Sequence, residues 1–535
     1  MEIGCLPFSE TGYFSKLITD YVSGAAALRS YYDHPPTLSG LEKQRDAKIT
    51  HFSAAHRKLL QEVLTEQYKT LDHTQEVHQQ IEALGQPNTT TVVTGHQLNL
   101  FSGPLYFLYK IVAVINLAEQ LSKDKKRGKV VPVYWMATED HDFEEINFFN
   151  IKGIKLQWTP PYKVSGAVGR CTTQGLEEVL PHLESVLGTG KNARYLLDLF
   201  ESSYLEQPNL SAATRFFAHR LFGDKGLLII DGDHPRLKRL LIPHIKKDLF
   251  EHTAFEKVKQ TNLALSAEAT GYHIQVNPRE INYFYLEGNI RERIVATAQG
   301  FEVQNTHLSF SSEEMEQLLE AHPERFSPNV IARPLYQEVI LPNIAYIGGG
   351  GELAYWLELK SYFEAHKVLF PVLMLRNSAL LLSEKQLKKW TKMGMTPSDL
   401  FLKRHPLINK KIRSISNIDL DLSELRKQLH QQFLSLYDLA TQTDPSFLGA
   451  VQAQEVKQIK GINALEKRLL LAQKKKLQDQ VTRLSELHET LFPAQSLQER
   501  QQNFSEFYVA YGPQLLQELF NHLNPLKNGF SVLSL

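Results

Sequence analysis

The fold is decided by VVPVYWMA (130–137), a nearly continuous apolar run that ends directly in the polar residues TEDHD (138–142). An apolar run of this kind is typical of a strand buried on both faces, and such strands occur in parallel sheets covered by helices. Upstream lie a β-branched run, TVVT (91–94), and a helical pattern from Pro104 to Leu121. Strand, helix and strand in this order predict a βαβ unit, which joins two parallel strands.

Two further apolar runs extend the predicted sheet. LLII (227–230) and VLFPVLML (368–375) both end in polar residues, as the first run does. The sequence therefore predicts the fold class α/β, with a doubly wound core. We expect this core to cover residues 91–380, with an insertion at about 151–225 that glycine and proline punctuate. An N-terminal helical segment, residues 1–90, is expected to pack on the core.

The composition changes after Leu380, where leucine, lysine, glutamine and glutamate dominate. A break at 443–445 separates two helical stretches, so the sequence predicts a projecting antiparallel coiled-coil hairpin over residues 381–492. The alternative is an amphipathic hairpin that packs on its own core. A heptad seam supports the coiled coil, and its leucines are Leu470, Leu477, Leu484 and Leu491.

The last segment, residues 493–535, is expected to return to the core as a tail. Its end, FSVLSL (530–535), alternates apolar and polar residues. An alternating pattern is typical of a strand with one buried face. We therefore expect an edge strand at the C-terminus.

Composition excludes several classes of protein. The 535 residues include 59 Lys+Arg and 59 Asp+Glu, so the formal net charge is zero, and 42% of them are hydrophobic. Such a chain is neither disordered nor a broad electrostatic partner of nucleic acid. Its two cysteines exclude a disulfide framework and a multi-cysteine zinc site. With no secretory signal and no apolar run near the ~20 residues that span a bilayer, we expect a cytoplasmic protein without membrane or nucleic-acid partners.

Polar clusters follow the predicted strands, where open α/β sheets bind their ligands. The first cluster contains Gly95, His96, Gln97 and Asn99. Glycine lets the backbone approach a ligand, and histidine carries protons near neutral pH. The alternative is a turn whose histidine only caps the next helix. Three different polar side chains in one turn favour a binding site.

The second cluster, Glu139, Asp140, His141 and Asp142, follows the strand at 130–137. Carboxylates beside a buried strand are costly unless they are solvated, paired or bound to something. They can hold a metal ion, bind an ammonium group or act as acid and base. The spacing matches no metal-ligand motif, so we assign no metal. The alternative is a helix start that favours acidic residues.

The third cluster is a run of four glycines that ends in Gly349, Gly350 and Gly351, followed by Glu352. Backbone N–H groups in such a loop can bind phosphate or carboxylate. Glu352 would repel a bare anion but suits an amine, so we expect a zwitterionic or amino-sugar ligand. The alternative is a tight turn. No Walker A, H-E-x-x-H, G-x-S-x-G or C-x-x-C motif occurs in the chain.

Longer motifs occur over the whole chain. They are TGHQLNLFSGPLYFLYK (94–110), VVPVYWMATEDHDFEEIN (130–147), SPNVIARPLYQEVILPNIAYIGGGGELAYW (327–356), LQERQQNF (497–504) and YGPQLL (511–516). In these motifs the sequence is similar to the bacillithiol synthase family, the cysteine-adding ligases that make the low-molecular-weight thiol bacillithiol. The resemblance implies a Rossmann-like core with insertions and a homodimer formed through a C-terminal coiled coil.

The implied activity is the last step of the pathway, which joins the carboxylate of cysteine to the amine of glucosaminyl malate. Amide formation needs an activated acyl group, a neutral amine and stabilisation of the oxyanion. Either His96 or His141 can take the ammonium proton, with Asp140 beside them. The two carboxylates of malate suit the guanidinium groups of Arg333 and Arg376.

Further residues are predicted to bind substrate. Asp140, Asp142 and Glu352 can hold an amino group. The cofactor is left open, with ATP or another nucleotide as the candidate. Two rival functions remain: a nucleotidyl- or acyl-transferase acting on another small acid, and a non-catalytic coiled-coil interaction protein. The other predicted substrate-binding residues are Gly95, Gln97, Asn99, Glu139, Gly349, Gly350, Gly351, Tyr355 and Asn377.

Overall fold

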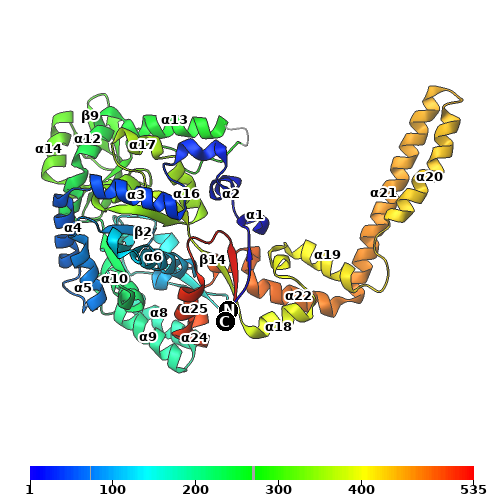
Figure 1. Cartoon of the computed structure of the whole chain (residues 1–535), viewed down its shortest axis with the longest axis horizontal. Helices are drawn as coiled ribbons and strands as arrows, with labels where there is room; N and C mark the ends of the chain where they lie inside the picture. Colours follow the sequence, from blue (N-terminus) through cyan, green and yellow to red (C-terminus); the bar gives the residue numbers. More distant parts are fainter. Residues whose placement is uncertain (73, 268–270) are drawn as a thin grey trace. The chain divides into compact units, whose positions relative to one another are not determined.

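The computed structural model describes residues 1–72, 74–267 and 271–535 (Figure 1). The chain folds as two units. The first contains residues 1–380 with 498–533 and 535, and the second contains residues 381–497 with 534. Every strand that carries a predicted polar cluster lies in the first unit.

The first unit is built on a five-stranded parallel sheet, which confirms the α/β, doubly wound prediction. Its spatial order is β13-β12-β2-β3-β6. The apolar runs form these strands because each strand is buried between covering elements. The bounds are β2 Thr90–His96, β3 Val130–Met136, β6 Leu228–Asp231, β12 Asn343–Gly348 and β13 Val372–Leu375.

Two helices pack closely on this sheet. Helix α6 (Tyr106–Ser122) connects β2 to β3, and helix α3 (Leu38–His51) comes from the N-terminal segment. One apolar cluster joins both helices to the sheet through Leu41, Val114 and Ile347. The N-terminal segment also forms α2 (Lys16–Ser23), α4 (Ala54–Gln67) and α5 (Gln75–Leu84).

Two insertions interrupt the sheet. Between β3 and β6 lie a hairpin, β4 (Phe148–Ile151) and β5 (Ile154–Gln157), and three helices, α8 (Val179–Leu187), α9 (Lys191–Tyr204) and α10 (Leu210–Phe222). Between β6 and β12 lies an antiparallel sheet of order β10-β9-β8-β7-β11, which the sequence did not predict. Its strands are β7 Tyr283–Glu287, β8 Ile290–Thr297, β9 Gly300–Val303, β10 Ser309–Phe310 and β11 Phe326–Pro328.

The C-terminal strand β15 (Phe530–Ser534) corrects one prediction. It lies in the middle of a three-stranded sheet of order β1-β15-β14, so it is not an edge strand. All five of its residues are buried, because β1 (Glu2–Leu6) and β14 (Ser378–Leu382) flank it on both sides. Strand β1 itself was not predicted from the sequence.

The second unit is helical, and α20 (Ser423–Ala440) and α21 (Pro445–Lys476) pack along each other. The predicted break falls between them, where Asp444 caps the start of α21. The helical stretch before the break consists of three helices, and Gly394, at φ +67°, follows the end of the first. The first two helices are α18 Glu384–Lys392 and α19 Arg404–Ile415, and α20 is the third. Helix α22 Gln478–Leu491 follows α21.

The predicted leucine seam does not run along the α20–α21 hairpin. Leu477 lies at the junction of α21 and α22. Leu484 and Leu491 are fully buried on α22, which packs on α19. Leu484 and Leu491 therefore stabilise a contact within this unit, while Leu470 lies on α21 and is only partly buried. Among the described residues, no helix is long and apolar enough to cross a membrane.

Candidate functional site

The order of the parallel strands places the ligand site between β2 and β12. The chain runs from β2 to β3 and β6 on one side and from β12 to β13 on the other, so the strand order reverses between β2 and β12. Ligands of open α/β sheets bind beyond the carboxyl ends of the strands at such a reversal. The histidine loop follows β2 and the glycine loop follows β12, so the reversal has a predicted cluster on each side.

A cavity of about 790 Å³ opens at this edge of the sheet. Its volume is within the range usual for small-molecule sites. Three predicted residues are not on its wall: Asn99, Gly350 and Asn377. The cavity brings together the other predicted residues, which are Gly95, His96, Gln97, Glu139, Asp140, His141, Asp142, Arg333, Gly349, Gly351, Glu352, Tyr355 and Arg376.

Two of the three residues outside the cavity wall, Asn99 and Asn377, form hydrogen bonds to the backbone of other segments. Asn99 donates to the Glu145 carbonyl at 3.3 Å, which ties the histidine loop to the segment after β3. Asn377 donates to the Asn524 carbonyl at 2.9 Å and so binds the tail to the core. Both side chains therefore hold segments next to the cavity without lining it.

The charge of the cavity changes across the sheet. We call Lys110, Arg333, Arg376 and Arg500 the cationic end, because they lie around the segments that follow β2, β12 and β13. We call Glu139, Asp140 and Asp142 the acidic end, because they follow β3; the Arg291 guanidinium also reaches this end, at His141. The strand order keeps the two ends apart, with the histidine loop between them.

At the cationic end, Glu352 already has a cation. The Lys110 ammonium is 2.7 Å from its carboxylate, and Tyr346 Oη and the Gly349 N–H each donate to it at 2.8 Å. Burial alone would raise the pKa of Glu352, but Lys110 and these hydrogen bonds outweigh it and lower the pKa. The carboxylate expected to hold a substrate amine is therefore occupied by a lysine of the chain.

The two predicted arginines of the cationic end are rigidly held. Arg376 bonds to Glu499 at 2.7 Å through Nη2 and to the Asn377 carbonyl through Nη1, but its buried Nε has no partner among the described residues. Arg333 donates to Gln337 at 3.1 Å and lies about 6 Å from the rings of three aromatic residues, Trp135, Tyr346 and Trp356. A fixed guanidinium with a spare N–H suits a carboxylate ligand.

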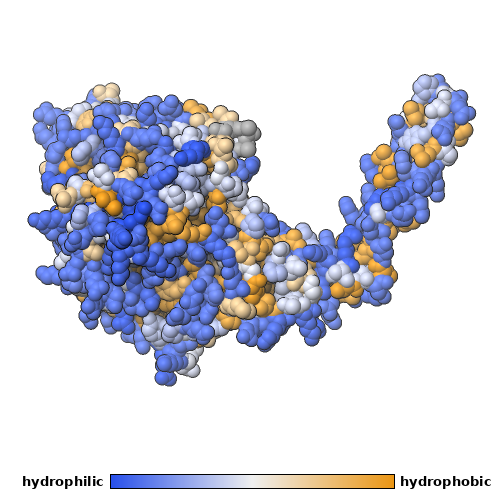
Figure 2. All heavy atoms as spheres, in the orientation of Figure 1, coloured by the Kyte–Doolittle hydropathy of each residue, from blue (hydrophilic) through white to orange (hydrophobic). Residues whose placement is uncertain are grey.

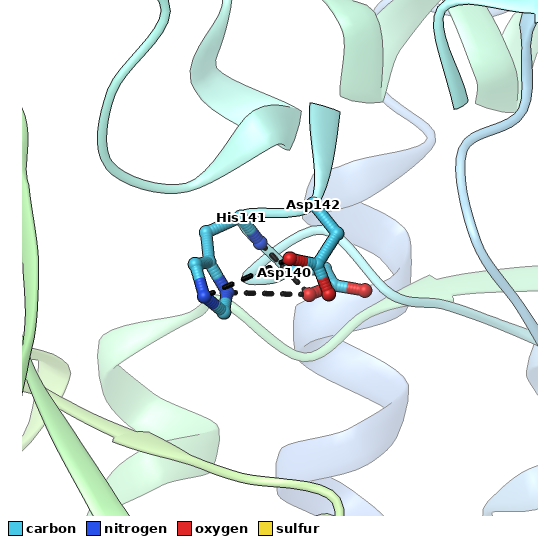
Figure 3. A group of neighbouring side chains, drawn as sticks. All are labelled: Asp140, His141 and Asp142. Carbon is cyan, nitrogen blue, oxygen red and sulfur yellow. Dashed lines mark hydrogen bonds and ion pairs between the residues drawn. The ribbon is translucent and has the colours of Figure 1, made fainter. Parts of the chain in front are cut away.

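At the acidic end, Gln97 links the first two predicted clusters. Its amide donates to Asp140 at 3.1 Å and to Glu145 at 3.0 Å, so the loops after β2 and β3 are joined by one side chain. The His141 N–H also donates to Asp140, at 2.8 Å (Figure 3). Burial would raise the pKa of Asp140, but these hydrogen bonds lower it to about 2. Asp140 is therefore a fixed negative charge.

The other two acids differ from Asp140. Glu139 is paired with the fully buried Lys238, yet burial raises its pKa. Asp142 is half exposed. Its pKa is raised by partial burial and by the negative charge of the neighbouring Asp140. Within the described ranges, neither Asp140 nor Asp142 forms an ion pair with lysine or arginine. Both are open to a cationic group of a ligand.

The two histidines have different environments. Burial lowers the pKa of His96 to about 3, and its Nε2 has no partner in the described part of the chain. A histidine with so low a pKa stays neutral at pH 7, so it can orient a ligand through its ring nitrogens but is a weak base. His141 is half exposed, and its Nδ1 lies 2.6 Å from the Arg291 guanidinium. To act as a base at this nitrogen, His141 must be released by Arg291.

A metal ion fits the acidic end less well than an ammonium group. Asp140, His141 and Asp142 each offer a ligand atom, and these atoms lie within 4.8 Å of one another. However, the Arg291 guanidinium contacts Nδ1 of His141, so this nitrogen is not free to bind a metal ion, whereas an ammonium group needs only the carboxylates. We therefore assign no metal to this cluster.

Several residues of the cavity wall were missed by the sequence reading. Lys110 had a detectable signal, since it is a lone cation inside the apolar helix α6. Arg291 and Arg293 belong to the unpredicted antiparallel sheet, and Arg279 precedes it. Arg500 belongs to the tail. Only the folded chain brings these arginines to the same cavity.

Comparisons with known proteins agree with the fold. Residues 1–377 match the family model "Bacillithiol biosynthesis BshC, N-terminal Rossmann-like domain". Residues 379–535 match "Bacillithiol biosynthesis BshC, C-terminal coiled-coil domain". Together the two models account for both units of the chain.

Curated relatives match over nearly their full lengths. A protein of Christiangramia forsetii named "Putative cysteine ligase BshC" is 51% identical, and the match covers 100% of this chain and 99% of that protein. The protein of the same name from Flavobacterium johnsoniae is 50% identical, with 100% of both chains covered. A Bacillus cereus relative with this name is 29% identical over 93% of this chain and 94% of its own.

Proposed function

The chain belongs to the bacillithiol biosynthesis BshC family, and from this membership we propose that it is a ligase that joins cysteine to glucosaminyl malate. The new bond is an amide between the cysteine carboxyl carbon and the sugar amine. One oxygen of the carboxyl group leaves, as water or on the activating group, and the ammonium nitrogen loses two of its three protons and keeps one in the amide. The names of the relatives support a cysteine ligase in this pathway.

The observation that carries the proposal is the separation of charge across the cavity. Glucosaminyl malate has two carboxylates at one end and an amine at the other, and the cavity has a cationic end and an acidic end. In the proposed orientation, malate lies at Arg333 and Arg376, near the N-terminus of α16 (Gly350–Leu357). The amine lies at Asp140 and Asp142.

This orientation assigns roles to the remaining groups. The fixed charge of Asp140 stabilises the ammonium form of the amine, so a second group must accept the proton before the amine attacks. His141 is the proposed acceptor because it lies beside Asp140 and Asp142 and is half exposed. Gly351, at the start of α16, presents a backbone N–H to an anion, because the first N–H groups of a helix have no helical partner.

One assay tests this function. Purified protein is incubated with cysteine and glucosaminyl malate, with and without ATP, and the products are identified by mass spectrometry. We expect the cysteinyl amide in at least one of the two mixtures, and the ATP arm identifies the activating agent. Asp140→Asn should lower product formation strongly, because it removes the fixed charge that binds the amine.

Two outcomes would contradict the proposal. Transfer of a nucleotidyl or acyl group to another acid, with no cysteinyl amide, would favour the transferase alternative. Full activity of Asp140→Asn would place the amine elsewhere. Glu177→Gln is the matched control, since Glu177 is a carboxylate in the same unit but outside the cavity wall.

We further propose that a second copy of this chain binds at helix α20. Four leucines, Leu425, Leu429, Leu436 and Leu439, are spaced by four, seven and three residues, which returns to one face of a helix. Leu425 and Leu439 are 50% and 54% exposed. Figure 2 shows hydrophobic residues on the visible surface of the hairpin. An apolar stripe of this kind marks a protein interface.

The dimer prediction uses residues of this stripe. Leu436→Asp/Leu439→Asp places two charges on the stripe and is expected to give a monomer in sedimentation experiments. Gln431→Asp/Ser435→Asp adds the same charge elsewhere on α20 and should leave the dimer intact. Leu484→Asp is unsuitable because Leu484 is fully buried within the unit. A dimer of unchanged strength in the leucine variant would contradict the proposal.

A further inference from the structure

One part of the cavity wall has no regular secondary structure. Residues 271–282 connect α13 (Thr253–Ala267) to β7, and the described part of this segment forms neither helix nor strand. Asn277, Arg279 and Ile281 of the segment line the cavity. Since no ladder of backbone hydrogen bonds fixes them, their positions depend on contacts with other elements.

The middle of this segment is held by one buried carboxylate. Glu358 accepts the Gln275 N–H at 2.7 Å and the Val276 N–H at 3.3 Å, one with each oxygen. Asn262 of α13 donates to the Val276 carbonyl at 2.8 Å, so the next peptide group, between Val276 and Asn277, is held as well. Glu358 is fully buried and forms no ion pair with any described residue.

The two ends of the segment have other anchors. Tyr272 Oη donates to Asp20 at 2.8 Å. Arg279 and Asn282 form two hydrogen bonds with each other, at 3.2 and 2.7 Å. Because the Arg279–Asn282 contacts lie within the segment itself, loss of the Glu358 contacts would loosen the stretch from Gln275 to Arg279, although Asn262 still holds the Val276 carbonyl.

Glu358 also lies at the end of α16, the helix whose first turn carries Glu352 into the cavity. This short helix therefore contributes directly to the cavity at its N-terminus and holds a second part of the wall at its C-terminus. Burial raises the pKa of Glu358 to about 7, although hydrogen bonds from Gln275 and Val276 oppose the rise. Burying the Glu358 carboxylate is costly because no cation pairs with it. Its presence at this position therefore indicates a specific role.

We infer that Glu358 is a positioning residue that sets the places of Asn277 and Arg279 in the cavity by holding the N–H groups of Gln275 and Val276. The ligand class is an anionic amino sugar, whose carboxylate or hydroxyl groups suit a guanidinium and an amide. This choice of ligand rests on the proposed function. The positioning itself does not.

The first test is a double-mutant cycle read by calorimetric titration with glucosaminyl malate. Glu358→Gln keeps the size of the side chain but replaces one acceptor by a donor, and we expect its affinity to fall about tenfold, equivalent to 1.4 kcal/mol. In an Asn277→Ala/Arg279→Ala background the same substitution should change the affinity little, because the positioned groups are absent. Glu364→Gln, at an exposed carboxylate 59% accessible, is the matched control.

Hydrogen exchange supplies a readout that does not depend on the ligand. In Glu358→Gln, the amides of Gln275 and Val276 should lose protection while the melting temperature stays close to that of the wild type. If glucosaminyl malate does not bind the wild-type protein, the proposed function fails, and the exchange data alone decide the positioning role. Unchanged protection of the two amides, or an equal loss of affinity in both backgrounds, would overturn the inference.

Discussion

Glu499→Ala is expected to lower the free energy of unfolding by about 3–5 kcal/mol, the usual cost of removing one partner from a buried ion pair. Glu499 accepts from Arg376 at 2.7 Å and from Ser378 Oγ and the Ala379 N–H at 3.1 Å. The side chains of Glu499 and Arg376 are 0% and 4% exposed. The substitution therefore leaves a buried cation and two donors without their acceptor.

Denaturant unfolding followed by tryptophan fluorescence measures this effect. Three of the four tryptophans, Trp135, Trp158 and Trp356, lie in the first unit, so the signal reports mainly on that unit. Glu316→Ala is the control, because its pair with Lys246 is partly exposed and such pairs contribute about 0–1 kcal/mol. A loss for Glu499→Ala no larger than that of the control would contradict the expectation.

The same contact explains how the tail contributes to the site. Arg376 follows β13 and lines the cavity, while Glu499 lies in α23 (Gln498–Gln501) beside Arg500, which also lines it. Glu499 orients one guanidinium, and its neighbour supplies another. A charged pair between residues so distant in sequence leaves no local pattern, so the role of Glu499 could not be predicted.

The sequence predicts those parts of the fold that have a local signature. Buried parallel strands such as β3 are recognisable because both faces are apolar. The polar residues after β2, β3 and β12 could be assigned to one site because parallel strands share a carboxyl edge. The spatial order of the strands, which separates the acidic from the cationic end, came only from the structure.

Patterns with more than one explanation led to the errors. The heptad leucines predicted a contact surface, and Leu484 does lie on one, but a heptad does not say which helix is the partner. The alternating end of the chain predicted an edge strand with one exposed face, whereas β15 is buried on both faces and β1 pairs along its edge. The antiparallel sheet was missed because β8 has only one fully buried residue, Ile294, and alternation there is weak.

Glu352→Gln is expected to lower the free energy of unfolding by about 3 kcal/mol, at the low end of the range for a broken buried pair. The variant leaves Lys110, whose side chain is 4% exposed, without its carboxylate partner. Two features keep the loss of stability at this low end. Lys110 keeps its hydrogen bond to the Gly95 carbonyl at 2.8 Å, and the Glu352 side chain is 28% exposed.

The pH dependence of this loss follows from the pKa of Glu352. The pKa is lowered in the folded protein, so the ionised carboxylate stabilises the fold above its ordinary pKa and loses this effect as the pH falls through the lowered value. The difference in stability between Glu352→Gln and the wild type should therefore be complete at pH 7 and shrink below pH 4.5. Unfolding curves measured at pH 7 and at a pH below 4.5 test this, with Glu364→Gln, at an exposed carboxylate, as the control.

Ligand binding by Glu352→Gln tests whether the glycine loop before Glu352 binds the carboxylates or the amine of the substrate. The sequence favoured an amine beside Glu352, but the structure places Lys110 there, so removing the negative charge makes the cationic end more positive. L-malate should then bind several-fold more tightly, while D-glucosamine, which we place at Asp140 and Asp142, should bind unchanged. Calorimetric titration with each compound separates the two readings. Weaker binding of glucosamine by Glu352→Gln would return the amine to the glycine loop and reverse the proposed orientation of the substrate.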